Sequence, residues 1–333
     1  MKKLICMILA LALLVSLCAC GKKGNGEASE TQTPEADVTV KVMALNGPTG
    51  FGMAGLMHNS ASGSAGQAYE FSVETDASNI AAALISGSVD IAALPTNAAS
   101  VVYNKTGGAV QALALNTRGV LYLLSDGSRK IVDFTSLAGE IVYAPAQNPS
   151  FILEALCRAY GLTPGEDLTI DNSIAQPADL RTAIAAGEIH LAVLPEPMVT
   201  TALAENENLR VEMDLTEQWD MVQPQGSLVQ GCVAVRKEFA EKHPGQVRTF
   251  LEEYQASVAL CSDDAAAAAG YIAEAGILPN AELAQAALPN CNLCFVTGAD
   301  MKTQLSRYLE LIGQVNAQSI GGQLPGDDFY YLP

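Results

Sequence analysis

Residues 76–104, DASNIAAALISGSVDIAALPTNAASVVYN, contain the pattern that decides the fold. An amphipathic helical pattern ends at Gly87, the short apolar strand VDIAAL follows, and Leu-Pro then opens a second helical pattern. Residues 176–206, QPADLRTAIAAGEIHLAVLPEPMVTTALAEN, repeat this order with Gly187 in the corresponding place. We therefore expect two related α/β halves in which each glycine ends a helix directly before a buried parallel strand.

The segments upstream of both repeats also correspond. Residues 40–50, VKVMALNGPTG, and residues 140–150, EIVYAPAQNPS, each predict a strand, a turn and the start of a helix. In the second segment Asn148 is a candidate N-cap and Pro149 the first helical residue. Strands that alternate with helices predict a mostly parallel sheet with helices on both faces in each half.

Ligands of open parallel sheets lie beyond the carboxyl ends of the strands, where helix N-termini present free N–H groups. Four strand-to-helix turns occupy such positions in this sequence. They are residues 47–53 and 95–97 in the first half and residues 146–150 and 195–197 in the second.

The first of these turns lies in a glycine-rich loop, residues 45–57, LNGPTGFGMAGLM. Gly47, Gly50 and Gly52 match neither the spacing and lysine of a phosphate loop nor the spacing of a dinucleotide site. Two interpretations remain. The loop is a structural turn, or its glycines bring backbone amides close to a ligand and Phe51 offers a stacking surface.

The N-terminus, MKKLICMILALALLVSLCAC, has the order of a secretory signal: two lysines, an apolar run and small residues. Its apolar run, residues 4–17, is shorter than a membrane-spanning helix. The sequence around Cys20 resembles the lipobox of bacterial lipoproteins, which implies cleavage after residue 19 and lipidation of Cys20; an uncleaved anchor is the alternative. Residues 21–37 are rich in Gly, Glu, Ser and Thr and predict a flexible tether.

Charge and cysteine content exclude several kinds of partner. The chain of 333 residues has a formal net charge of −18 and no cluster of Lys and Arg after the tether, which argues against nucleic acid. Five cysteines follow the signal and form no disulfide framework. Cys291 and Cys294 have the C-x-x-C spacing of a redox pair or half a zinc site, but no second pair or suitable histidine accompanies them, which favours a structural or incidental pair. We expect no metal and no cofactor.

The sequence resembles the lipid-anchored substrate-binding proteins of bacterial ABC importers, in the branch similar to the binders of nitrate, sulfonate, taurine and thiamine precursors. The segments that carry the resemblance run through the whole chain from residue 38 to residue 331: GPTGFGM, SGSVDIAALPTNAASVVYNKTGG, GVLYLL, GEIHLAVLPEPMVTTAL, LTEQWD, GCVAVRKEFAEKHPG and GGQLPGDDFYY. The resemblance implies a two-lobed periplasmic-binding-protein-like fold of the second topological type, with residues 38–126 and 227–333 in one lobe and residues 127–226 in the other.

The same resemblance implies capture of a small molecule by closure of the lobes, outside the cytoplasm, and delivery to a membrane permease and its ATPase. We expect a monomer held at the membrane by its lipid. The residues expected to contact the ligand are Thr49, Gly50, Phe51, Thr96 and Asn97 on the first lobe, and Asn148, Ser150 and Glu196 on the second.

Ligand charge is constrained by what the four turns contain. None has an Arg or Lys; Arg118 is the nearest candidate for an anion and is also compatible with an exposed loop charge. Glu196 either accepts from an amine or ring N–H of the ligand or caps its own helix. The inventory favours a neutral or amine-bearing small organic molecule.

Two other functions share the fold. An enzyme needs a positioned acid, base or nucleophile, and the turns offer one carboxylate and no His or Cys. An exported sensor that delivers its ligand to a receptor has the same sequence features as an importer component. Two further residues have structural interpretations: Trp219 as a core residue and Asp328 as a solvated one.

Overall fold

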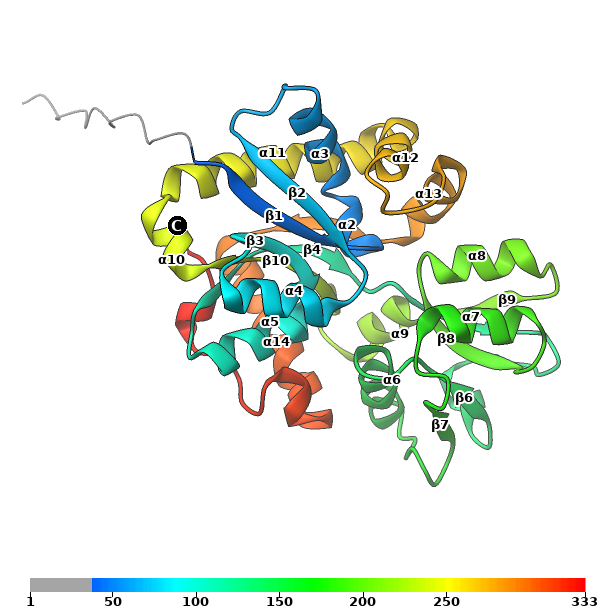
Figure 1. Ribbon diagram of the computed structural model, residues 1–333. Helices are drawn as coiled ribbons and strands as arrows, with labels where there is room; N and C mark the ends of the chain where they lie inside the picture. The colour runs from blue at the N-terminus through cyan, green and yellow to red at the C-terminus, as the bar shows by residue number, and fades with distance from the viewer. Residues whose placement is uncertain (1–37, 333) are drawn as a thin grey trace, which may run out of the picture. The chain divides into compact units, whose positions relative to one another are not determined.

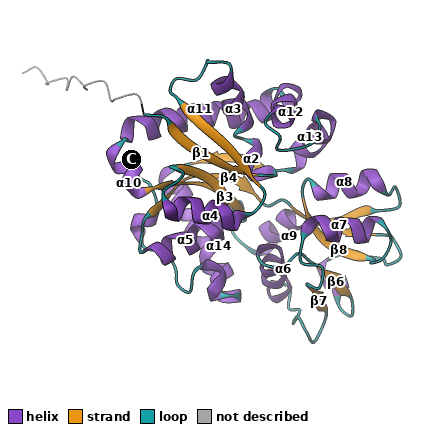
Figure 2. Ribbon diagram, in the orientation of Figure 1, coloured by secondary structure: helices purple, strands orange, loops and turns teal. Residues whose placement is uncertain are grey.

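The computed structural model describes residues 38–332 and contains two β-sheets, each with helices against both faces (Figure 1, Figure 2). We call the six-stranded sheet with its helices the first lobe and the five-stranded sheet with its helices the second lobe. Both sheets belong to the same compact unit of the chain. The two-lobed α/β fold predicted from the repeat is confirmed.

In the first lobe, four of the six strands run in one direction. The strands in spatial order are β11 (Leu293–Val296), β4 (Val110–Arg118), β10 (Val229–Arg236), β3 (Ile91–Pro95), β1 (Val40–Leu45) and β2 (Tyr69–Glu74). Strand β1 pairs in parallel with β2 and β3, whereas β10 is antiparallel to both β3 and β4. Strand β10 is therefore a returning strand inserted among parallel ones.

The second lobe repeats this arrangement with one strand fewer. Its strands in spatial order are β7 (Thr169–Asp171), β6 (Ile141–Tyr143), β8 (Leu191–Pro195), β5 (Leu121–Ser125) and β9 (Arg210–Asp214). Strand β6 is parallel to β7 and β8, and β5 is antiparallel to β8 and β9. In each lobe the antiparallel strand inside the sheet is thus the one that the chain enters from the other lobe.

The first crossing between lobes lies earlier than expected from the sequence. The sequence places residues 121–125 in the first lobe, but they form β5 of the second sheet, between β8 and β9. All five residues of this segment, LYLLS, are buried there, so the turn after residue 125 also belongs to the second lobe. The crossing falls at Gly119, where a Cβ would lie 2.3 Å from Thr216 Oγ1, so no larger residue fits without a shift.

Helices of the first lobe cover its sheet in two layers (Figure 1). One face carries α4 (Ala77–Ser86), α5 (Thr96–Thr106) and α14 (Gly298–Val315). The other carries α2 (Pro48–Phe51), α3 (Ala54–Ala61), α10 (Lys237–Lys242) and α11 (Pro244–Asp263), with α12 (Ala265–Glu274) and α13 (Ala281–Ala287) packed beside them. Alternate residues of the buried strands point into these two cores, as the pleat requires.

Helices of the second lobe are likewise divided between two faces. Helices α6 (Asn148–Ala159) and α9 (Leu215–Val222) pack on one face, and α7 (Pro177–Ala185) and α8 (Met198–Glu205) on the other. Four short 3-10 turns complete the described chain: η1 (Phe134–Leu137), η2 (Leu288–Asn290), η3 (Ala317–Ile320) and η4 (Asp327–Phe329).

Both repeat glycines end helices as predicted. Gly87 is the left-handed C-cap of α4 (φ 73°), and β3 follows with every residue from Ile91 to Leu94 buried. Gly187 (φ 74°) follows α7, and β8 follows it with the same burial. An L-residue with a Cβ is disfavoured at such φ values, which explains why a glycine occupies both turns.

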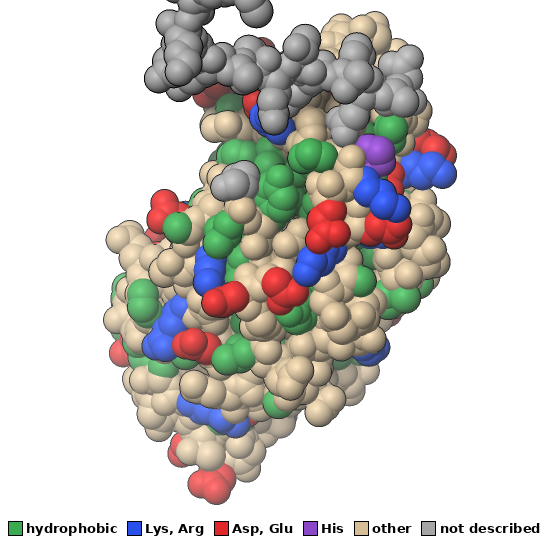
Figure 3. Space-filling view, turned by 90° about the vertical axis from the view of Figure 1, so that its left-hand side faces the viewer, with side chains coloured by type: hydrophobic (Ala, Val, Ile, Leu, Met, Phe, Trp, Pro, Cys, Tyr) green, Lys and Arg blue, Asp and Glu red, His purple; other side chains and the backbone are tan. Residues whose placement is uncertain are grey.

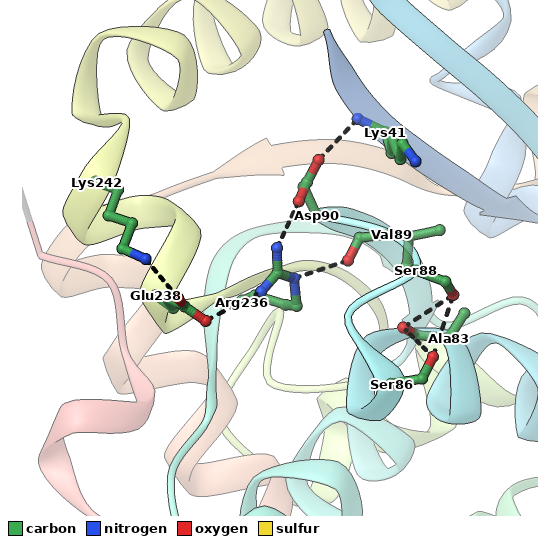
Figure 4. A network of polar contacts seen from close by, with 9 residues as sticks. All are labelled: Lys41, Ala83, Ser86, Ser88, Val89, Asp90, Arg236, Glu238 and Lys242. Atoms are coloured by element: carbon green, nitrogen blue, oxygen red, sulfur yellow. Dashed lines mark hydrogen bonds and ion pairs between the residues drawn. The ribbon is translucent and has the colours of Figure 1, made fainter. Parts of the chain in front are cut away.

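A buried ion pair fastens the start of β3 to its neighbours (Figure 4). Asp90 accepts from the backbone N–H of Lys41 at 3.0 Å and from Arg236 Nη2 at 2.7 Å, while Arg236 Nε donates to the Val89 carbonyl at 3.0 Å. The contacts join β1, the start of β3 and the end of β10. They satisfy a carboxylate that is nearly removed from water.

Two structural interpretations of single residues can now be compared with the structure. Trp219 is fully buried, and its indole N–H donates to Ser227 Oγ at 2.9 Å, which confirms a core role. Asp328 is half-exposed and accepts from Tyr103 and from Lys237 at 3.1 Å, so it is partly solvated but paired.

Candidate ligand-binding cavity

A cavity of about 810 Å³ lies at the carboxyl ends of the strands of both sheets, with walls from both lobes. All four turns predicted from the sequence contribute to it. Their lining residues are Gly47, Pro48 and Thr49; Pro95 and Asn97; Ala146, Gln147, Asn148 and Pro149; and Pro195, Glu196 and Pro197. The structure therefore brings the four turns together around one space, and ligand contact at their residues stays a prediction.

The glycine-rich turn lines the cavity only with its first residues. Gly47 has φ 99°, a value that favours glycine, and lets the chain turn from β1 into α2. Thr49 lies at the cavity wall, and its carbonyl accepts from Asn116 Nδ2 at 3.0 Å, which holds the turn against β4. Thr49 thus stays a candidate contact.

For Gly50, Phe51 and Gly52 the structure favours the interpretation of the loop as a structural turn. None of them lines the cavity, and the Phe51 ring is fully buried among residues of α12 and α13. A Cβ on Gly50 would lie 2.2 Å from the Leu45 carbonyl, and one on Gly52 would lie 2.8 Å from Val258. Because Gly50 and Gly52 have no side chain, α2 packs closely on β1 and α11. The ring of Phe51 between them points into the core and not toward the cavity.

The second turn of the first lobe separates two neighbouring residues. Thr96 does not line the cavity: it is fully buried and its hydroxyl donates to the Val229 carbonyl at 2.8 Å, tying α5 to β10. Asn97 does line it and is 8% exposed. Its Nδ2 donates to the Ser319 carbonyl at 3.2 Å, while its Oδ1 has no hydrogen-bond partner in the described part of the chain.

The third turn has a different cap from the one predicted. Gln147 (φ 71°) is the N-cap of α6, and Asn148 is its first residue. Asn148 lines the cavity, and its Oδ1 accepts from the hydroxyl of Tyr308, on α14 of the first lobe, at 2.8 Å. Ser150 lies behind the wall, where it donates to the Pro145 carbonyl at 2.9 Å and accepts from Asn172, so it supports the turn and does not reach the ligand space.

Glu196 is the most buried carboxylate at the cavity, with 2% of its surface exposed. It accepts from the backbone N–H of Thr200 at 3.1 Å, from the Thr200 hydroxyl at 2.9 Å and from Asn290 Nδ2 at 3.3 Å. Burial raises the pKa of this carboxyl, and the bonds from Thr200 and Asn290 oppose the shift only in part. Glu196 therefore caps α8, and it also faces the cavity, so the two roles predicted for it do not exclude one another.

Sequence reasoning missed a charged pair at the cavity wall. Arg181 of α7 and Glu205 of α8 both line it and form an ion pair. Both residues stand inside helices and not in the four turns, which is why the turn-based search passed over them. The helical pattern contained a signal for Arg181, because this residue lies only one turn after the start of α7 (Pro177–Ala185).

The other cation considered for an anionic ligand lies elsewhere. Arg118, at the end of β4, donates through Nη1 to the Gly226 carbonyl at 2.6 Å. Arg118 does not line the cavity, and the bond joins the two segments at which the chain crosses between lobes.

The C-x-x-C pair is reduced in the structure. Cys291 and Cys294 are free thiols, and burial raises the pKa of both, that of Cys294 to about 11. Within residues 38–332 no group of three His, Cys, Asp or Glu side chains is placed to hold a metal ion. A raised pKa disfavours the thiolate that redox exchange and metal binding require.

A family model matches residues 65–288, which is more than half of the chain: the substrate-binding domain of the ABC-type glycine betaine transport system, OpuAC. The chain belongs to this family. It is therefore a substrate-binding protein of the ABC transport type. Members of this family are transport components found outside the cytoplasm, and the family is not an enzyme family.

Solved structures with the same fold include an ABC transporter protein from Parabacteroides distasonis, 23% identical over 89% of this chain and 99% of that chain, with a TM-score of 0.75. The aliphatic sulphonate-binding protein SsuA of Escherichia coli is 15% identical over 89% and 92%, with a TM-score of 0.71. The alkanesulfonate-binding SsuA of Xanthomonas axonopodis pv. citri, bound to MOPS, is 13% identical over 89% and 98%, with a TM-score of 0.66. These identities establish the fold alone, and no curated protein matches the sequence.

Figure 3 shows one face of the protein, on which Lys and Arg side chains lie beside Asp and Glu side chains and form no separate patch. Among residues 38–332 there is no helix with the length and apolarity of a membrane span. The prediction of a lipid anchor at Cys20 concerns residues outside the described part of the chain.

Proposed function

We propose that this protein is a lipid-anchored solute-binding component of an ABC importer that captures a small organic molecule between its lobes. The observation that supports the proposal most directly is the cavity of about 810 Å³, whose walls come from both lobes. A ligand that contacts both walls binds the closed arrangement more tightly than the open one and shifts the population toward closure. The closed complex is then the form delivered to the permease and its ATPase.

The connection between lobes suits this motion. The chain crosses at Gly119–Val120 and again just before β10, and two side chains brace these segments. Gln230 Oε1 accepts from the Val120 N–H at 2.8 Å, and Asn292 Nδ2 donates to the Gly119 carbonyl at 2.6 Å. Two neighbouring crossings allow rotation of one lobe against the other while both sheets stay intact.

We propose Thr49 and Asn97 as ligand contacts on the first lobe, and Asn148 and Glu196 on the second. Each lines the cavity and carries a polar group. Arg181 and Glu205 join this set because they lie at the same wall.

Anchoring at Cys20 would hold the protein at the outer face of the cytoplasmic membrane, near a permease. A sensor that passes its ligand to a receptor instead would use the same cavity and the same anchor. Genes for a permease and an ATPase beside this gene favour import, and a neighbouring receptor gene without them favours sensing.

Mass spectrometry of small molecules retained by the purified protein tests capture without presupposing a compound. We expect one or a few compounds to be released on denaturation, each at a ratio near one per chain. The Glu196→Gln and Asn97→Ala proteins, purified in parallel, should retain less of the same compounds. A protein that retains nothing, and that binds nothing from a cell extract, contradicts the capture function.

A further inference from the structure

We propose that the ligand of this cavity is a donor-rich nitrogen compound, uncharged or singly positive, that offers N–H groups to acceptors on both lobes; the inference rests on the capture function proposed above. It follows from the chemical character of the cavity wall. The lining side chains that matter are the primary amides Asn46, Asn97, Gln147, Asn148, Gln176 and Gln230, the threonines Thr49, Thr75, Thr117 and Thr201, and the charged residues Arg181, Glu196 and Glu205.

Among residues 38–332, no aromatic ring lines this cavity. A quaternary ammonium ligand such as a betaine is held by the faces of aromatic rings, because its cation has no N–H with which to donate a hydrogen bond. Amide and threonine side chains supply no such faces. The wall therefore suits a ligand that uses hydrogen bonds, and not a trimethylated cation.

An anion is disfavoured by the charges of the wall. Arg181 is the one cation that lines the cavity in the described part of the chain, and Glu205 neutralises it in an ion pair. Glu196 adds a second carboxyl close to the same space. A sulfonate or carboxylate ligand is held best by positively charged donors on the protein. None of these three residues has an unpaired positive charge to offer.

Acceptors remain available on both lobes. Asn97 Oδ1, on the first lobe, is buried without a partner although the residue as a whole is 8% exposed. Glu196, on the second lobe, receives its three hydrogen bonds from neutral groups alone, so its carboxyl has no positive partner within the described residues. A buried acceptor such as Asn97 Oδ1 is costly until a donor meets it, and a buried carboxyl whose donors are all neutral gains from a further donor. An N–H group of the ligand at each lobe supplies these donors.

The donors Asn46, Gln147 and Gln176 add adaptable contacts at the rim. Their side chains line the cavity and make no hydrogen bond to other residues among those that the structure describes. A primary amide both donates and accepts, so these residues suit carbonyl or ring-nitrogen groups on the same ligand. Amides, aminopyrimidines and simple amines have this combination of groups, whereas sulfonates and betaines do not.

Calorimetric titration and thermal-shift measurements with matched probes test the ligand class. The probes are ethanolamine against choline, which differ only in methylation of the nitrogen, together with cytosine and nicotinamide as N–H donors and glycine betaine and ethanesulfonate as their opposites. We expect at least one of the N–H probes, ethanolamine, cytosine or nicotinamide, to bind. Choline should bind more weakly than ethanolamine. Glu196→Gln should weaken the best N–H probe by about tenfold or more.

Two variants and one control separate this result from loss of folding. Asn97→Ala should weaken the same probe independently of Glu196. Glu207→Gln, at an exposed carboxyl that does not line the cavity, should leave the affinity unchanged. Melting curves of the unliganded proteins show whether each variant is folded. Preferential binding of glycine betaine or ethanesulfonate overturns the ligand class but leaves the capture function standing. Binding of none of the N–H probes also overturns the class, and the retained-compound experiment then judges capture separately.

Discussion

Phe51 has a core role and not the ligand-contact role that the glycine-rich loop suggested for it. Its ring has no exposed surface and packs among residues of α12 and α13. The glycines beside it serve close packing of α2, so the loop combines a cavity-lining start at Gly47 with a core-forming end.

Phe51→Ala should therefore lower the stability of the unliganded protein. Truncating a buried phenylalanine removes its packing and leaves a cavity, which typically costs about 3–5 kcal/mol. Urea unfolding followed by circular dichroism measures the change, and Val132→Ala, at an exposed apolar residue, is the control. A variant that unfolds like the wild type but loses its ligand would restore the stacking role.

Glu196 makes stability depend on pH in a direction that can be stated. Its pKa in the folded protein lies above the reference value of 4.5, because burial disfavours the charged form. The folded state thus binds the proton more tightly than the unfolded state. The contribution of this group to stability is fully present below pH 4.5 and is lost as the pH rises through the folded pKa.

Replacement by glutamine removes this titration. The free energy of unfolding of Glu196→Gln, relative to the wild type, should rise with pH above about 4.5 and level off above the folded pKa of the carboxyl. Chemical unfolding at a series of pH values measures the difference, with Glu207→Gln as the control at an exposed site. A difference that stays constant across this range would show that the folded pKa of Glu196 is not raised.

At the scale of elements, contacts between lobes use helices that lie far apart in the sequence. Tyr308 of α14 donates to Asn148 of α6 at 2.8 Å, and Asn290 of η2 donates to Glu196 at the start of α8 at 3.3 Å. The Asn290 carbonyl also accepts from the Tyr122 hydroxyl of β5 at 2.9 Å. Two proposed ligand contacts are thus positioned by the opposite lobe.

Tyr308→Phe should weaken the contact between the lobes. The change removes one hydroxyl from a buried site, and loss of its hydrogen bond should lower the free energy of unfolding by about 0.5–1.5 kcal/mol. We also expect a larger radius of gyration for the unliganded protein in X-ray scattering, because the bond joins α14 to α6.

Tyr160→Phe is the matched control for this measurement. The Tyr160 hydroxyl donates to the Gln218 carbonyl at 3.2 Å, and both residues belong to the second lobe. This variant should lose stability without a change in radius. Equal radii for both variants would show that the bond from Tyr308 stabilises local packing only.

At the scale of the whole molecule, the two lobes have corresponding sheets. Inside each sheet lies an antiparallel strand, β10 or β5, that the chain enters by crossing from the other lobe. Membership of the substrate-binding family agrees with this architecture, and capture by closure is the proposal that the cavity between the lobes supports.

Anchoring also concerns the whole molecule. Cys20→Ser should block lipidation, so the protein should appear in the medium or remain as an uncleaved precursor. Cell fractionation and the intact mass of the product measure the outcome. A variant that stays in the membrane fraction with the mass of the mature wild-type protein contradicts the lipobox prediction.

Much of the architecture follows from local sequence patterns. The helix-to-strand order, the helix ends at Gly87 and Gly187, and the four turns at the cavity depend on periodicity and turn chemistry within about thirty residues, so they were predicted correctly. The strand from 121 to 125 was placed in the wrong lobe because nothing within its five residues says which sheet it joins.

The side chains that face the cavity were decided by tertiary structure. Thr96 is turned to the carbonyl of Val229, 133 residues away, while its neighbour Asn97 faces the cavity. Phe51 is held in a core built from α12 and α13, and Glu196 meets Asn290, 94 residues along the chain. Sequence alone determined where the chain turns, because turning depends on neighbouring residues. Only the packing of distant segments determined which side of each turn is buried, because burial depends on what lies opposite.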